Sequence, residues 1–304
     1  MKPLSIFILI GLLFGLNVFA QNSFQDVANM SDKNFAKMLY MWPAGKGMPD
    51  GSGISPYLVD KEIKKVALIA YTMVAGESYD KFSKVAKGFT EEGIKYFSNK
   101  IYDNTISSIK EAFAKEGIEV ITYDELTDAQ KKIFNATQGT NWTDGKKFTD
   151  WGEKQLATGE SAYQYKHWEL QRGVEIPWVD EPIADFAKSL GVDAALLISN
   201  GLNFEGSTLM YGSMMITMLG ENPVPLEEGK KRPFGSEALY YGQGQIILDK
   251  KVEVANIKKN SVSGENYEGL GKIYERLIGY MMIDINGRKN DPDFKFNKWL
   301  KDNL

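Results

Sequence analysis

Aromatic side chains gather between residues 136 and 180, in a stretch with few aliphatic residues. Four of the six tryptophans lie there, and with one of the two tyrosines of the stretch they form the candidate set: Trp142, Trp151, Tyr163, Trp168 and Trp178. Trp and Tyr rings stack on sugars, flat ligands and partner proteins, and they contribute much of the energy of many interfaces. These five residues are therefore the predicted ligand-binding positions, and packing of the stretch over the core is the alternative.

Residues of catalytic type occur without the companions that catalysis requires. His167 is the only histidine, and a lone histidine without a recognisable partner more often has no catalytic role. Ser78 and Ser107 each begin an S-x-x-K motif, but neither S-D-N nor K-T-G follows. Asp and Glu pairs are too numerous for one to be nominated, so a carboxylate-based hydrolase stays open as an alternative. No catalytic residue is predicted.

No metal or cofactor site is expected from the residue types present. The chain has no cysteine and one histidine, which excludes thiolate and multi-histidine metal sites. Met210, Met214 and Met218 share one face of a predicted strand, where core packing is a better explanation than Cu(I) binding. The acidic and amide residues from Asp284 to Asp293 do not match a calcium-binding loop, and a helix end at Gly287 followed by a polar turn explains them.

The first twenty residues have the pattern of a secretory signal peptide. Lys2 supplies a positive start, residues 4–19 are mostly apolar, and Ala20 precedes a polar stretch. The apolar run is shorter than the roughly 20 residues that span a membrane, so cleavage near Ala20 is expected and an uncleaved anchor is the alternative. A chain without cysteine cannot carry a lipid on a thiol, and it fits a bacterial protein that is periplasmic or secreted.

The remaining residues are enough for one large domain or two small ones. Residues 21–60 are expected to form an N-terminal leader region, and residues 61–304 a single α/β domain with an insertion at 136–180. A formal charge of −4 without a basic stripe argues against nucleic acid as a partner. No second apolar run reaches membrane-spanning length, so no transmembrane segment is expected after signal removal.

Apolar runs and glycines predict the elements that position the candidate residues. Two helix–Gly–strand steps, with Gly117 and Gly191 at the helix ends, predict parallel strands joined by crossovers. A strand at 209–219 follows a short connection and is expected to be antiparallel to its predecessor. Helices are expected at 31–41, 96–115, 182–190 and 267–285, and further strands at 65–75, 118–123, 192–199 and 245–254. The fold class predicted is α/β, with a mixed, partly parallel sheet flanked by helices and an aromatic-rich insertion.

Four segments carry a resemblance to known envelope proteins: KKVALIAYT, ISSIKEAFAKEGIEVITYDEL, IADFAKSLGVDAALLIS and GKIYERLIGYMMIDI. Together they resemble the periplasmic α/β domains of the curli secretion channel family and of the outer-membrane activators of penicillin-binding proteins. The resemblance covers residues 64–285 without the 136–180 stretch. The chain departs from those families in having no lipid-anchoring cysteine and no obvious membrane-inserting hairpin, and no functional residue carries over.

The resemblance implies non-enzymatic work in the bacterial cell envelope, such as assembly, secretion or scaffolding through a bound partner. One alternative is a protein that binds glycans or small ligands through the aromatic stretch. The other is the carboxylate-based hydrolase, and the oligomeric state stays open. If the stretch is peripheral, deleting residues 140–178 leaves a core that still unfolds cooperatively.

Overall fold

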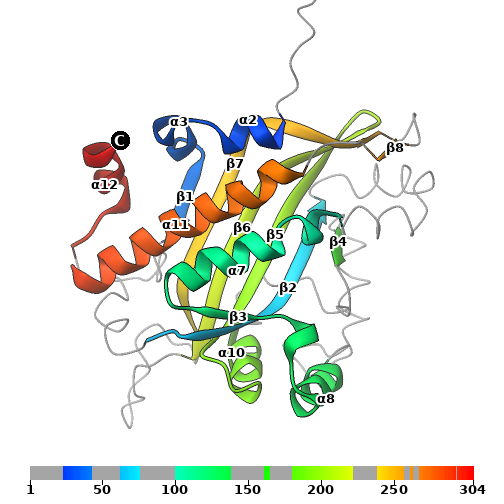
Figure 1. Ribbon diagram of the computed structural model, residues 1–304, viewed down its shortest axis with the longest axis vertical. Coiled ribbons are helices and arrows are strands. Elements are labelled where there is room, and N and C mark those ends of the chain that lie inside the picture. The colour runs from blue at the N-terminus through cyan, green and yellow to red at the C-terminus, as the bar shows by residue number, and fades with distance from the viewer. Residues whose placement is uncertain are drawn as a thin grey trace, which may run out of the picture.

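The computed structural model describes residues 23–42, 62–75, 100–137, 161–164, 180–221, 238–256, 261–262, 267–291 and 293–304 (Figure 1). The predicted signal segment at 1–20 lies outside these ranges, as does most of the aromatic stretch. Where the structure is described, one mixed sheet carries helices on both of its faces. The predicted α/β class, with its partly parallel sheet flanked by helices, is confirmed.

The sheet has eight strands, and its main path runs β1-β7-β6-β5-β2-β3, with β4 paired to β2 and β8 paired to β7. The strands are β1 Leu39–Trp42, β2 Lys65–Ala75, β3 Glu119–Ile121, β4 Ser161–Gln164, β5 Ala194–Glu205, β6 Thr208–Glu221, β7 Ala238–Asn256 and β8 Ser261–Val262. The described helices are α2 Phe24–Ala28, α3 Asp32–Ala36, α7 Ile106–Lys115, α8 Asp128–Thr137, α10 Asp180–Ser189, α11 Glu268–Asn290 and α12 Phe296–Asn303, with a 3-10 turn at Tyr123–Glu125.

The parallel part of the sheet contains the two predicted crossovers. Strand β2 pairs in parallel with β3 on one side and with β5 on the other. Each of these neighbours follows a helix that ends at a glycine with positive φ, 76° at Gly117 and 70° at Gly191. That left-handed backbone is open to glycine without steric cost, which is why both helices stop there and the chain turns into a strand.

The rest of the sheet is antiparallel, as the short connection before residue 209 predicts. Strand β5 turns at Gly206, where φ is 63°, and returns as β6. Strand β6 then pairs with the 19-residue strand β7, which pairs with β1 at its outer edge. Strand β7 is therefore longer than the predicted 245–254 and is the second strand from the edge.

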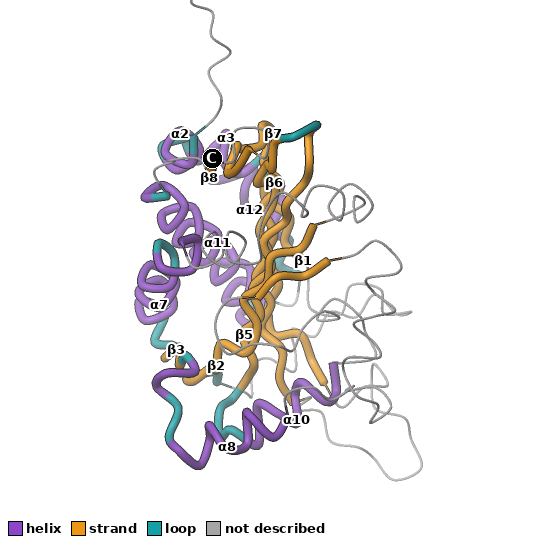
Figure 2. Tube along the Cα trace, turned by 90° about the vertical axis from the view of Figure 1, so that its right-hand side faces the viewer, coloured by secondary structure: helices purple, strands orange, loops and turns teal. Residues whose placement is uncertain are grey.

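Side chains alternate between two cores on opposite faces of the sheet. In β2, Val66 and Leu68 join a large core beneath α2, α7 and α11, whereas Ala67 and Ile69 join a smaller core beneath α8 and α10. Figure 2 shows α7 and α11 lying along one face, with α8 and α10 near one end of the sheet. The predicted stripe of α11 is buried against the sheet through Ile273 and Leu277.

The N-terminal residues 23–42 pack onto the same large core. The helix expected over 31–41 is wrong in its second half, because α3 ends at Ala36 and Leu39 begins strand β1. The single helix expected over 96–115 is also interrupted: residues 100–103 are helical, and α7 begins after a turn at Thr105. Phe35, Met38, Ile109 and Phe113 are buried and Tyr102 and Ile106 are partly buried, although neither segment forms a single helix.

Candidate functional site

The structure brings one of the five predicted ligand-binding residues into the sheet. Tyr163 lies in β4, which pairs antiparallel with β2 and sets Tyr163 opposite Met73. Trp142, Trp151, Trp168 and Trp178 lie outside the described residues, and so does His167. The aromatic stretch thus contributes a strand at the β2 edge, and the predicted stacking positions stay predictions.

A second candidate site follows from the register of the antiparallel strands. Ser199 in β5 pairs with Met215 in β6, Met215 pairs with Gln245 in β7, and Gln245 pairs with Tyr40 in β1. Because paired residues point to the same side of a sheet, these four lie in one row across four strands. Leu39 and Ile246, their chain neighbours, are buried in the large core, so the row faces away from α11.

Two neighbouring rows lie on the same side of the sheet, where Ser199 and Thr217 are buried and Tyr40 and Ile247 are exposed. Thr217 pairs with Gln243 on one side, and Ser213 pairs with Ile247 on the other. We call the whole set the uncharged sheet face, because it contains no acidic or basic side chain: Tyr40, Ser199, Ser213, Met215, Thr217, Gln243, Gln245 and Ile247. Gln243 donates a hydrogen bond to the Met215 sulfur at 3.2 Å.

The uncharged sheet face exposes two large apolar side chains close together. Tyr40 is 48% exposed and Ile247 is 45% exposed. Tyr40 lies on β1 and pairs with Gln245 of β7, and Ile247 lies two residues further along β7. Helices α8 and α10 cover this side of the sheet near Ala195, Leu197 and Leu219. No helix in the described part of the chain lies over the rows that contain Tyr40 and Ile247. Residues 39–42 are apolar or aromatic without polar alternation, so the sequence carries no signal for this strand or its exposed tyrosine.

A cluster of buried hydroxyl groups lies on the opposite side, between the sheet and α11. The Asn200 side-chain oxygen accepts hydrogen bonds from Tyr211 and, at 2.6 Å, from Tyr274. The Tyr71 hydroxyl lies 2.7 Å from the Thr105 hydroxyl, which itself donates to the Ile101 carbonyl at 2.9 Å. Burial raises the pKa of all three tyrosines well above the ordinary value, so they stay neutral at physiological pH. Through Tyr274, the cluster fixes the packing of α11 against β5 and β6.

The acidic group near the end of α11 serves a structural ion pair. Asp284 and Arg288 are both buried, one helical turn apart, and the Arg288 guanidinium donates to the Asp284 carboxylate. Burial raises the pKa of Asp284, and the Arg288 charge opposes that shift. The helix end predicted at Gly287 is wrong, because α11 continues to Asn290 and Gly287 packs against Phe294.

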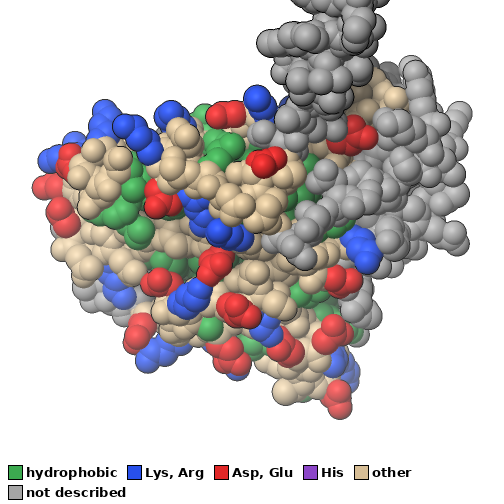
Figure 3. Space-filling model, turned by 45° about the horizontal axis from the view of Figure 1, so that its top comes forward, with side chains coloured by type: hydrophobic (Ala, Val, Ile, Leu, Met, Phe, Trp, Pro, Cys, Tyr) green, Lys and Arg blue, Asp and Glu red, His purple; other side chains and the backbone are tan. Residues whose placement is uncertain are grey.

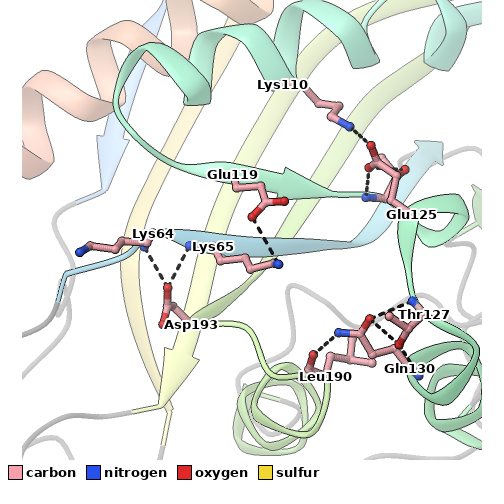
Figure 4. A network of polar contacts seen from close by, with 10 residues as sticks. Lys64, Lys65, Lys110, Glu119, Glu125, Thr127, Gln130, Leu190 and Asp193 are labelled. Carbon is pink, nitrogen blue, oxygen red and sulfur yellow. Dashed lines mark hydrogen bonds and ion pairs between the residues drawn. The ribbon is translucent and has the colours of Figure 1, made fainter.

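Charged side chains elsewhere tie the strand ends together. At one end of the sheet, a carboxylate oxygen of Asp193 accepts hydrogen bonds from the backbone N–H groups of Lys64 and Lys65, both at 2.9 Å (Figure 4). Lys65 also pairs with Glu119 of the neighbouring strand at 3.3 Å. Basic and acidic side chains are intermixed over the surface in Figure 3. The described residues contain no group of three or more acidic residues arranged to hold a metal ion.

Comparison with protein-family models, with curated proteins and with solved structures finds no match. Over the described part of the chain, every helix is too short or too polar to cross a membrane.

Proposed function

We propose that this protein is a non-enzymatic component of the bacterial cell envelope that binds a protein partner in assembly, secretion or scaffolding. The observation that carries the proposal is the uncharged sheet face, on which Tyr40 and Ile247 are exposed side by side. The N-terminal signal pattern and the resemblance to envelope domains support the location.

The composition of the uncharged sheet face matches the centre of a protein interface. Interface centres are depleted in charged residues and enriched in aromatic residues and Met. Tyr40 and Met215 supply those residue types, and Gln243 and Gln245 beside them supply hydrogen-bond donors and acceptors. Tyrosine is also among the residues that most often dominate binding energy, so Tyr40 is the expected centre of the contact.

The test is a comparison of matched surface variants in cells that produce the protein at its native level. A cross-linking capture is carried out with the wild type, with Tyr40→Ser combined with Ile247→Ser, and with Ile133→Ser. Ile133 is the matched control because it is 37% exposed but lies on α8, away from the uncharged sheet face.

We expect a defined envelope protein to be cross-linked to the wild type and to Ile133→Ser, and to be lost from the double variant. The protein recovered in the capture should itself begin near Gln21 if its signal segment is removed. Capture that is equal in all three proteins, or that is absent from all three, contradicts the proposal.

A second function rests on the aromatic stretch. Trp142, Trp151, Trp168 and Trp178 would then bind a glycan or small ligand together with Tyr163, which β4 holds at the edge of β2. Glycan-array binding that is lost on replacing these tryptophans, but retained in the Tyr40 and Ile247 variant, would favour this function over a protein partner.

A further inference from the structure

A cavity of about 270 Å³ lies between the second half of α11 and the sheet. It lies where α11 extends beyond the end of α7. At about 1.5 Å per residue, the 23 residues of α11 extend about 35 Å, whereas the 10 residues of α7 extend about 15 Å. Where α7 ends, the described residues that line the hollow beside α11 are the turn at Glu116–Ile118 and residues 62–64 before β2.

The inside of the cavity is apolar. Ile118, Met218, Met282 and Ile285 line it from the turn, the sheet and α11. Tyr241 also lines it, but its hydroxyl already donates to the carbonyl of Glu221. A ligand body that fills this space must therefore be apolar, because the described interior offers few free polar partners.

The mouth of the cavity is polar and electrically balanced. Glu62 and Glu116 bring two carboxylates, Lys64 and Lys289 bring two ammonium groups, and Asn286 brings an amide. Lys64 pairs with Glu62 at 3.0 Å, and its backbone is held by Asp193 (Figure 4), so this wall has a defined position. The two negative and two positive charges cancel, so the mouth offers neither an anion nor a cation a net attraction.

We propose that this cavity binds a small amphipathic molecule of zero net charge, with an apolar body inside and a neutral or zwitterionic head at the mouth. An apolar cavity of about 150 Å³ can hold benzene, so 270 Å³ accommodates a phenyl ring with a short polar extension. A ligand with a single charge gains no net attraction from the balanced mouth, and it loses hydration when it enters the cavity, so a charged ligand is disfavoured.

The test uses four probes that share one phenyl ring and differ in charge: L-phenylalanine, 2-phenylethanol, 3-phenylpropionate and 2-phenylethylamine. The protein is labelled with ¹³C at its methionine methyl groups, and each probe is titrated by NMR. Met218 and Met282 line the cavity, whereas Met214 is buried in the same core without lining it and serves as the internal control.

We expect the zwitterionic and neutral probes to shift the Met218 and Met282 signals but not the Met214 signal. We also expect them to bind about tenfold more tightly than the charged probes, which corresponds to about 1.4 kcal/mol. Asn286→Trp should close the mouth and weaken binding at least about tenfold, while Asn290→Trp on the same helix, outside the cavity, should not. The proposal is overturned if no probe shifts the two cavity methionines, if the charged probes bind as tightly, or if Asn286→Trp has no effect.

Discussion

The contact between α2 and α11 can be tested by one added methyl group. At Gly269, in the first turn of α11, a Cβ atom would lie 2.3 Å from the backbone carbon of Phe24 and 2.4 Å from the nitrogen of Gln25. Non-bonded carbon atoms pack at about 3.5–4.0 Å, and a backbone cannot rotate away as a side chain can. We therefore expect Gly269→Ala to push α2 from its position.

The expected cost follows from what α2 buries. Overpacking of a core costs about 1–3 kcal/mol, and complete release of α2 would expose Phe24 and Val27, worth about 1.5–3 kcal/mol each. Both side chains are 0% exposed. The overpacked state costs less free energy than complete release of α2 and is therefore the one expected. Gly269→Ala should thus lower the free energy of unfolding by about 1–3 kcal/mol.

Gly279→Ala is the matched control in the same helix. A Cβ atom at Gly279 would have no neighbour within 4 Å, so alanine there should bring only its helix propensity, a gain of up to about 1 kcal/mol. The two substitutions should thus have opposite signs in urea unfolding followed by circular dichroism. Phe24→Ala should also cost less in the Gly269→Ala protein than in the wild type. Equal stability of the two alanine variants would refute the reasoning.

Three further perturbations test other parts of the fold. Asn200→Ala removes the acceptor of two buried tyrosine hydroxyls and should destabilise the protein by about 2–4 kcal/mol in the same unfolding assay, whereas an unchanged midpoint would show that the cluster contributes little. Gly117→Ala places a Cβ at a φ of 76° and should cost about 1 kcal/mol, with Gly117→Asn costing less; equal stability would contradict the role of positive φ. The Ser23 backbone N–H and hydroxyl donate to Asp26 and lower the pKa of that carboxyl. The stabilisation is therefore present above the ordinary pKa of 3.8 and is lost as pH falls through the lowered value. Ser23→Ala should remove this pH dependence and about 1 kcal/mol of stability, and an unaltered pH profile of unfolding would count against it.

The parts of the fold that sequence predicts are those with a local physical cause. The apolar run of β2 indicates a strand buried on both faces, and Gly117 and Gly191 mark helix ends because each adopts a positive φ. Two such steps are enough to predict parallel neighbours, since a helix between two strands of one sheet brings them into the same direction. These predictions needed no knowledge of distant contacts.

The parts that were missed depend on distant contacts. Residues 38–41 have apolar side chains at spacings compatible with a short helix, and only pairing with β7 makes Leu39–Trp42 a strand. Strand β4 is likewise four residues long and exists as a strand through its pairing with β2. The tyrosine cluster joins Tyr71, Asn200 and Tyr274 from three separate elements, and no spacing along the chain signals that they meet.

Both proposed sites arise where strands extend beyond the helices that cover them. At about 3.3 Å per residue, the 14 residues of β6 extend about 46 Å, longer than any described helix of either layer. On one face α7 stops short and leaves the cavity beside Met218, and on the other α10 covers one end and leaves Met215 in the uncharged sheet face. Because side chains of one strand alternate, these two methionines lie three positions apart on opposite faces. A substitution at Tyr40 should therefore leave binding in the cavity unchanged. The proposed partner site and the proposed cavity site can thus be tested independently.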